Sequence, residues 1–188
     1  MNNEVLDGER EFFVTGVRTY LEADDAMTEF RRLVQHKCRT VASRRLDELN
    51  QACGMHWTVK ELDDYFEKND KNHYLGKRIE AKGFGGVYFC LRLSREDASR
   101  PFDAFVYLYR IRKDLANGLW DRPGAIAPVT YKSGHSLGFG RPLPEDKIPD
   151  FEDYLDQAVT LLLAFINESG GLQKYLAQNV KLGTDAIK

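Results

Sequence analysis

The spacing of apolar residues changes twice along this chain, and no other feature of the sequence constrains the fold as strongly. Between residues 9 and 49 the apolar side chains recur every three or four positions, as they do along a helix. Between residues 74 and 139 they alternate with other residues, as in strands, and from residue 150 the helical spacing returns. The order helices, strands, helices predicts an α+β fold with helices packed against one sheet.

The first helical block extends to about residue 70. Its beginning is predicted to form two helices, because Asp24 and Asp25 supply a capping signal for the second. One bent helix is the alternative, since nothing there strictly breaks a helix. Gly54 is predicted to end this stretch, since glycine readily adopts the conformation that terminates helices. Thr58 and Glu61 match a capping box, which predicts a further short helix.

The middle block is predicted to form an antiparallel sheet of about four strands. The connections between these strands are too short to hold crossover helices, so neighbouring strands are expected to run in opposite directions. The predicted strands are residues 74–82, 87–93, 102–112 and 129–139.

The second helical block begins at Asp150, which caps a helix whose apolar stripe reaches Ile166. A last short helix is predicted at residues 172–180. The length of the chain favours one domain with one core. We therefore predict a single domain over residues 1–188, with helices over about 9–70, strands over about 74–139 and helices over about 150–181.

Composition and charge restrict the classes of function. A net charge of -2 gives the protein no overall attraction for a polyanion, so any contact with nucleic acid must be local. Cys38, Cys53 and Cys90 are odd in number and widely spaced, which argues against a disulfide framework or a zinc site and favours a cytoplasmic location. The longest apolar stretch, residues 158–166, is too short to cross a membrane, so no membrane partner is predicted.

Residues 134–138 match the Gly-x-Ser-x-Gly pattern of serine hydrolases, with Ser136 in the place of the nucleophile. That fold requires a helix directly after the serine and a histidine later in the chain. No histidine follows His135, and two prolines within residues 139–144 oppose a helix. We therefore predict no catalytic role for Ser136. The four histidines of the chain show no ligand spacing, so no metal and no cofactor is predicted either.

Residues 82–89 read Lys-Gly-Phe-Gly-Gly-Val-Tyr-Phe. This octapeptide resembles the RNP1 sequence of RNA-recognition motifs at seven of eight positions, with Gly86 in place of an aromatic residue that stacks on a base in that family. The resemblance implies stacking of RNA bases on a sheet. The alternative is a hairpin turn at residues 83–86, because glycine clusters between strands are typical of turns.

Glu80 and Lys82 lie two positions apart on a predicted strand, so their side chains are expected on one face. Restriction-type nucleases use a Glu-x-Lys pair, together with an upstream aspartate, to hold a divalent metal ion and orient water. Asp63, Asp64 and Asp70 are the candidates for that aspartate. A metal-dependent nuclease is therefore one interpretation, and a solvated charged pair is the other.

Six basic residues lie between Phe30 and Leu46, with no acidic residue among them. On a helical projection they spread around the helix, which is unfavourable for a helix that enters a nucleic-acid groove. One interpretation is that these residues contact nucleic acid. The other is that they form ion pairs with acidic clusters such as Asp63–Asp64 and Glu145–Asp146. The six residues are Arg31, Arg32, Lys37, Arg39, Arg44 and Arg45.

Two predicted strands, residues 87–93 and 102–112, place aromatic and arginine side chains on one face. Along each strand one alternating set is apolar and belongs to the core, whereas the other set is aromatic and amphipathic. Tyrosine and arginine are enriched at protein interfaces, so this second set is predicted to contact a partner unless a second layer of helices covers it. The candidate residues are Tyr88, Arg92, Tyr107 and Tyr109, with Arg110 or Arg112 near the end of the strand.

Together these observations favour a small cytoplasmic protein of the inhibitor, immunity or regulatory type, which binds another protein through the aromatic face and needs no cofactor. Each enzyme motif considered lacks a required partner, so no enzymatic activity is assigned. One alternative is a nucleic-acid-binding protein that uses the same face and the basic residues 31–45. Another is a metal-dependent nuclease at Glu80 and Lys82.

Overall fold

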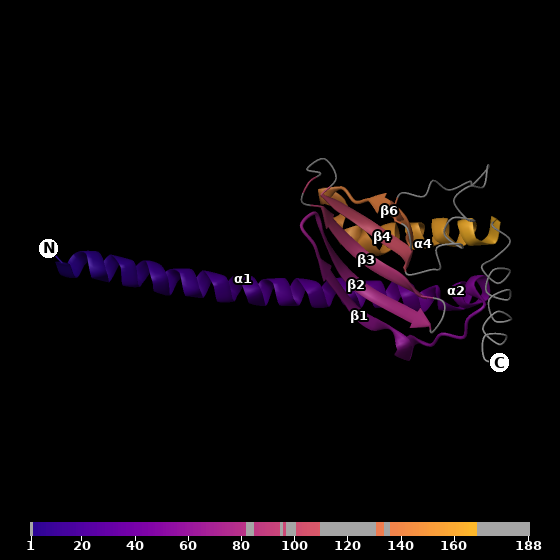
Figure 1. Ribbon diagram of the computed structural model, residues 1–188, viewed down its shortest axis with the longest axis horizontal. Coiled ribbons are helices and arrows are strands. Elements are labelled where there is room, and N and C mark those ends of the chain that lie inside the picture. Colours follow the sequence, from indigo (N-terminus) through magenta and orange to yellow (C-terminus); the bar gives the residue numbers. More distant parts are fainter. Residues whose placement is uncertain are drawn as a thin grey trace, which may run out of the picture. The chain divides into compact units, whose positions relative to one another are not determined.

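The computed structural model describes residues 2–81, 85–94, 96, 101–109, 131–133 and 136–168. By its internal packing the chain divides into two compact units, Met1–Leu33 and Val34–Lys188. Helix α1 belongs to both, and all strands belong to the second. In chain order the elements are α1 (Asn2–Arg44), α2 (Leu46–Cys53), the 3₁₀ helix η1 (Val59–Glu61), β1 (Asp63–Lys68), β2 (Asn72–Ala81), β3 (Gly85–Ser94), β4 (Phe102–Tyr109), β5 (Tyr131–Ser133), β6 (Ser136–Pro142), the 3₁₀ helix η2 (Glu145–Asp150) and α4 (Phe151–Glu168). Figure 1 labels the α-helices and most of the strands.

The strands form one antiparallel sheet in the order β1-β2-β3-β4-β6-β5. The predicted α+β class with an antiparallel sheet is therefore confirmed. The sheet has six strands, however, where about four were expected. The additional strands come from two segments that the sequence pattern did not assign correctly.

The helix predicted after Thr58 is wrong beyond its first turn. The backbone N–H of Thr58 donates to the Glu61 carboxylate at 2.7 Å, and η1 forms, but the backbone is already extended at Leu62. The following residues form β1, which pairs with β2 along its whole length. Leu62, Tyr65 and Phe66 fit helical spacing, yet Phe66 remains 46% exposed. Pairing with the adjacent strand β2 therefore outweighs the local helical signal.

The single strand predicted at residues 129–139 is instead two strands. Strands β5 and β6 pair with each other, with Ser133 opposite Ser136, and β6 also pairs with β4. Ser136 begins β6, which continues to Pro142, so the helix that a nucleophile elbow needs directly after its serine is not formed.

The remaining strand predictions agree with the structure within a few residues. Strands β2 and β3 are antiparallel neighbours, with Ala81 opposite Gly85, so the hairpin interpretation of the glycine-rich octapeptide is confirmed. Gly85 has a φ of 103°, a conformation that favours glycine. Lys82, residues 110–112 and the helix predicted at 172–180 lie outside the described residues.

The N-terminal helical region contains one long helix followed by a short one. Asp24 and Asp25 lie inside α1, so the prediction of two helices divided at these residues is wrong, and the alternative of one helix is correct. Helix α2 ends at Gly54, which adopts the left-handed conformation with φ 67°, as predicted. None of the described helices combines the length and apolarity needed to span a bilayer.

The core of the second unit lies between the sheet and a layer of helices. Residues 34–44 of α1, together with α2 and α4, lie on one face of the sheet (Figure 1), which we call the helix-covered face. The ring centroids of Phe139 on β6 and Phe165 on α4 are 5.4 Å apart. The apolar stripe predicted for α4 is buried almost throughout. Its buried members are Phe151, Leu155, Ala158, Val159, Leu162, Phe165 and Ile166.

Candidate functional site

The opposite side of the sheet carries a cluster of aromatic rings, which we call the tyrosine face. Strand pairing aligns Tyr88 with Tyr107, Cys90 with Phe105, and Gly76 with both Cys90 and Tyr65. Period two then places the side chains of four neighbouring strands on this side. The cluster consists of Tyr65, Tyr74, Tyr88, Cys90, Phe105 and Tyr107, with Tyr109 packed against it.

The rings of the tyrosine face pack against one another. The ring centroid of Tyr88 lies 4.7 Å from that of Tyr65, 5.0 Å from that of Tyr107 and 5.0 Å from that of Tyr109. Tyr88 is 1% exposed and Tyr107 is 5% exposed. The described helices of the second unit lie on the other side of the sheet. Among the described residues, the rings of the tyrosine face are therefore buried by one another and not by a layer of helices.

Glycines beside the aromatic residues make this packing feasible. A Cβ atom at Gly138 would lie 2.4 Å from Cζ of Phe105, so that ring occupies the space above the glycine. A Cβ atom at Gly76 would lie 1.9 Å from the carbonyl oxygen of Phe89, because β2 and β3 approach closely there. Aromatic side chains that cover glycines on adjacent strands are a recognised way to fill a sheet surface.

A chain of hydroxyl groups connects the centre of the tyrosine face to its edge. The hydroxyl oxygens of Tyr107 and Tyr65 are 2.6 Å apart, and the Tyr65 hydroxyl donates to the Glu67 carboxylate at 2.7 Å. Since Tyr65 donates to Glu67, Tyr107 donates to Tyr65. In the same region the Tyr88 hydroxyl donates to the Glu80 carboxylate. These bonds fix both carboxylates at the edge of the face.

Arg92 belongs to the tyrosine face but is held by neighbouring residues. Its guanidinium pairs with Asp103, whose carboxylate is fully buried, and lies 5.5 Å from the ring centroid of Phe105. Removing either member of such a buried pair leaves an uncompensated charge. The geometry therefore gives Arg92 a structural function within the sheet.

A polar cleft of about 450 Å³ opens where the tyrosine face meets the edge strand β1. Three carboxylates and one guanidinium line it, so its charge is negative. Arg78 lies 3.8 Å from Glu80, and Lys77, which is outside the lining, pairs with Asp64. The lining residues are Asp64, Tyr65, Phe66, Glu67, Arg78, Glu80, Tyr88 and Tyr109.

The buried tyrosines make the stability of the protein sensitive to alkaline pH. Burial raises the pKa of the hydroxyls of Tyr65, Tyr88 and Tyr107. In the unfolded chain they ionise near pH 10, whereas the folded protein keeps them neutral. Their contribution to stability is therefore fully present below about pH 10 and is lost as the pH rises beyond it.

We expect the free energy of unfolding, measured with urea, to fall between about pH 9 and pH 11. The Tyr107→Phe variant has one titrating group fewer, so its decrease should be shallower. Tyrosinate absorbance should show that these hydroxyls ionise only as the protein unfolds. A free energy of unfolding that stays constant up to about pH 11 would mean that the hydroxyls are accessible to water.

The structure brings some of the predicted site residues together. Tyr88, Tyr107 and Tyr109 lie on one face with Arg92, as the alternation predicted. Arg110 and Arg112 lie outside the described residues. Glu80 of the Glu-x-Lys pair lines the polar cleft, but Lys82 is not among the described residues.

The sequence analysis missed the part of the site that β1 and β2 contribute. Tyr65 and Glu67 were assigned to a helix, and Arg78 was not singled out. Residues 63–68 read Asp-Asp-Tyr-Phe-Glu-Lys, with the two aromatic residues adjacent, so no alternation of apolar and polar residues indicated a strand there.

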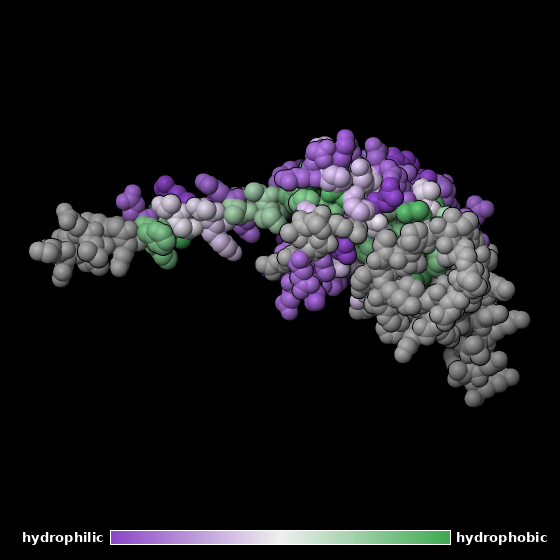
Figure 2. Space-filling model, turned by 90° about the horizontal axis from the view of Figure 1, so that it is seen from above, coloured by the Kyte–Doolittle hydropathy of each residue, from purple (hydrophilic) through white to green (hydrophobic). Residues whose placement is uncertain are grey.

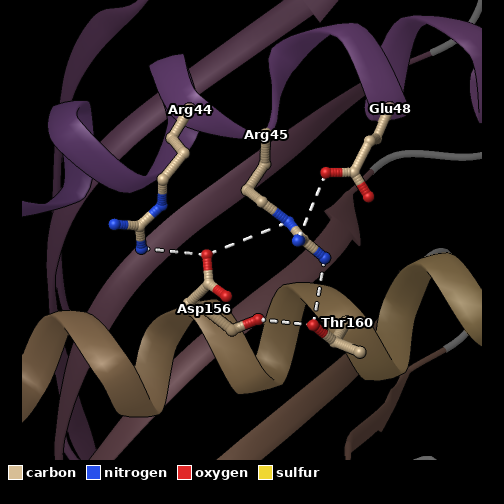
Figure 3. Close-up of polar contacts among 5 residues, drawn as sticks. All are labelled: Arg44, Arg45, Glu48, Asp156 and Thr160. Atoms are coloured by element: carbon tan, nitrogen blue, oxygen red, sulfur yellow. Dashed lines mark hydrogen bonds and ion pairs between the residues drawn. The ribbon is translucent and has the colours of Figure 1, made fainter.

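Most of the basic residues 31–45 form ion pairs within their own unit. Arg44 contacts Asp156 at 3.0 Å, and Arg45 contacts Glu48 at 3.2 Å and the Thr160 hydroxyl at 3.0 Å (Figure 3). Lys37 pairs with Glu152 at 3.2 Å, and Arg32 pairs with Glu29 at 2.7 Å. These ion pairs neutralise positive charges that would otherwise be available to the phosphates of a nucleic acid.

The described residues contain no group of three histidine, cysteine or acidic side chains placed to hold a metal ion. Cys38, Cys53 and Cys90 are free and buried. Burial raises the pKa of all three thiols, that of Cys53 to about 12, so they are unreactive near neutral pH. No family model, curated protein or solved structure matches this chain.

Proposed function

We propose that this protein binds another protein and that the polar cleft receives a basic side chain of that partner. The observation that carries this proposal is the position of Glu67 and Glu80, whose carboxylates are fixed at the cleft by tyrosine hydroxyls. Such a protein would act as an inhibitor, immunity protein or regulator, without a cofactor.

The charge of the cleft selects the chemistry of the partner. Asp64 is paired with Lys77, but Glu67 and Glu80 outnumber Arg78 in the rest of the lining, so a cation is attracted and a phosphate is repelled. An ionised carboxylate has about four acceptor positions, so each glutamate can accept further bonds beside the one from its tyrosine. A guanidinium or an ammonium group satisfies these acceptors with charge-assisted hydrogen bonds.

The cleft also offers apolar surface beside its carboxylates. Phe66 is 46% exposed and Tyr109 is half-buried, and both line the cleft. Aromatic rings of this kind contact the aliphatic stem of lysine or arginine and attract its charged end. Because the hydroxyl bonds hold the site in place before binding, less conformational entropy is lost on association.

We further propose that the protein acts in the cytoplasm. Three free cysteines without a disulfide support a reducing compartment.

The proposal is tested with the Glu67→Gln/Glu80→Gln double variant, which keeps the size of both side chains and an oxygen that can accept the tyrosine hydroxyl, but removes their charge. The wild-type protein is expected to capture protein from a nuclease-treated lysate, and a partner identified in this way is then titrated by fluorescence anisotropy. The double variant should bind it at least about 10-fold more weakly, because hydrogen bonds to charged groups contribute roughly 1.5–3 kcal/mol each.

The matched control is Glu145→Gln/Asp146→Asn, which makes the same charge change at two exposed residues of η2. This control should bind like the wild type, and both variants should keep the wild-type melting temperature. Undiminished binding by the cleft variant would refute the proposed site.

Capture that disappears after nuclease treatment would favour nucleic-acid binding through the same face and residues 31–45. Metal-dependent cleavage lost in both Glu80→Gln and Lys82→Ala would favour the nuclease.

A further inference from the structure

Helix α1 exposes large apolar side chains over residues 11–33. Figure 2 shows hydrophobic side chains, in green, at the surface of this helix beside hydrophilic ones. Phe13 is 72% exposed and Tyr20 is 70% exposed. A helix in water is usually stabilised by packing of its apolar face, and these residues lack such packing. The exposed large apolar residues are Phe12, Phe13, Val14, Val17, Tyr20, Leu21, Met27 and Leu33.

The spacing of these residues is that of a coiled coil. Phe13, Tyr20 and Met27 are seven positions apart, and Val34 and Val41 continue the series. Val34 and Val41 are 4% and 0% exposed, so this series of positions is one that the helix buries where it has a partner. A strict seven-residue repeat indicates packing against another helix, because it keeps the seam in contact as two helices supercoil.

A second series lies four positions after the first and completes the heptad. It contains Val17, Asp24 and Arg31, so two of its members are charged. The residues beside the seam, among them Gly16, Leu21 and Ala23, are uncharged. The remaining charged residues lie on the outer side of the helix. They are Glu11, Arg18, Glu22, Asp25, Glu29 and Arg32.

We propose that residues 11–33 of α1 form an antiparallel coiled coil with the same segment of a second copy of this chain. A parallel pair in register would place Asp24 against Asp24 and Arg31 against Arg31, and like charges in a seam are strongly unfavourable. An antiparallel pair centred on Glu22 avoids both conflicts.

The antiparallel register gives each seam residue a suitable neighbour. Val17 faces Met27 of the second copy, and Tyr20 faces Asp24, which accepts a hydrogen bond from the tyrosine hydroxyl. Phe13 faces Arg31, so that a guanidinium lies against an aromatic ring. The polar seam residues thereby fix the orientation and the register of the pair.

The size of the surface fits a pair of copies. The segment is roughly 35 Å long at 1.5 Å per residue. Its seam and flanking side chains supply on the order of 600–800 Å² per chain, since aromatic residues alone bury roughly 150–250 Å² each. A stable interface uses about 800 Å² per partner. Acidic residues outnumber basic ones over residues 11–33, which disfavours an anionic lipid surface as the occupant.

Phe12 and Phe13 provide a matched pair of variants to test this proposal. Both are strongly exposed, at 81% and 72%, but only Phe13 lies in the seam. In sedimentation equilibrium of the full chain, Phe13→Gln should raise the dimer Kd at least about 30-fold, whereas Phe12→Gln should leave it near the wild-type value. A wild-type chain that stays monomeric at about 100 μM would overturn the proposal, and so would equal effects of the two variants. Monomers that bind vesicles of phosphatidylcholine and phosphatidylglycerol would identify a lipid surface instead.

Cysteine cross-linking tests the orientation of the two helices directly. Val17→Cys and Met27→Cys chains should form a disulfide when they are mixed and oxidised, but neither should cross-link to itself, because each faces the other position in the antiparallel register. The three native thiols are buried and should not interfere. Efficient cross-linking of Val17→Cys to itself would show a parallel pair and overturn the register that we propose.

Discussion

Replacing Tyr107 by alanine is expected to lower the free energy of unfolding by roughly 3–5 kcal/mol, the loss typical of a buried aromatic residue. Its ring is 5% exposed and lies 5.0 Å from the ring of Tyr88 and 5.3 Å from that of Phe105, measured between centroids. The substitution opens a cavity among these rings and removes the hydroxyl that is bonded to Tyr65. Urea denaturation followed by circular dichroism measures the loss.

Two further variants separate the contributions of the ring and the hydroxyl. Tyr107→Phe keeps the ring, so it should cost only about 1 kcal/mol, the typical value of one hydrogen bond. Tyr109→Ala removes a less buried ring from the same face and should cost clearly less than Tyr107→Ala. If Tyr107→Ala unfolds at the wild-type urea concentration, the packing of the tyrosine face described above is wrong.

These variants also clarify which residues of the face are available to a partner. A side chain that is 1–5% exposed, as Tyr88 and Tyr107 are, contributes mainly by holding its neighbours in place. Under the proposed function, direct contact with a partner falls to residues at the rim, such as Tyr109, Phe66 and the two glutamates of the cleft. If a Tyr107 variant loses binding, its free energy of unfolding must therefore be measured as well, because a destabilised face would also lose binding.

The sequence predicted those parts of the fold that depend on local periodicity. Alternation in β3 and β4 assigned Tyr88 and Tyr107 to one face and Phe89 and Val106 to the other, and strand pairing places them so. The stripe on α4 was equally clear, because an amphipathic helix shows its buried side within a few turns. In these segments the local preference and the tertiary packing agree.

The candidate cleft could not be predicted from the sequence, because it depends on how four strands, β1 to β4, pair with one another. Tyr65 and Glu67 reach the site only through pairing of β1 with β2, while the local signal at Thr58 indicates a helix. The register that brings Tyr65 to within 2.6 Å of Tyr107, measured between hydroxyl oxygens, joins two segments about 40 residues apart. No periodicity within one segment contains this information.

Leu162→Ala tests the other face of the sheet and should lower the free energy of unfolding by roughly 2–5 kcal/mol. Leu162 is 0% exposed on the buried stripe of α4, so truncation leaves a cavity between this helix and the sheet. Leu161→Ala is the matched control, because its side chain is only half-buried and points about 100° away around the same helix. The control should cost much less, although both variants remove the same atoms from the same helix. Equal urea midpoints for the two variants would mean that α4 does not pack on the sheet through this stripe. A large difference would show instead that burial against β4 and β6, rather than helix propensity, holds α4 in place.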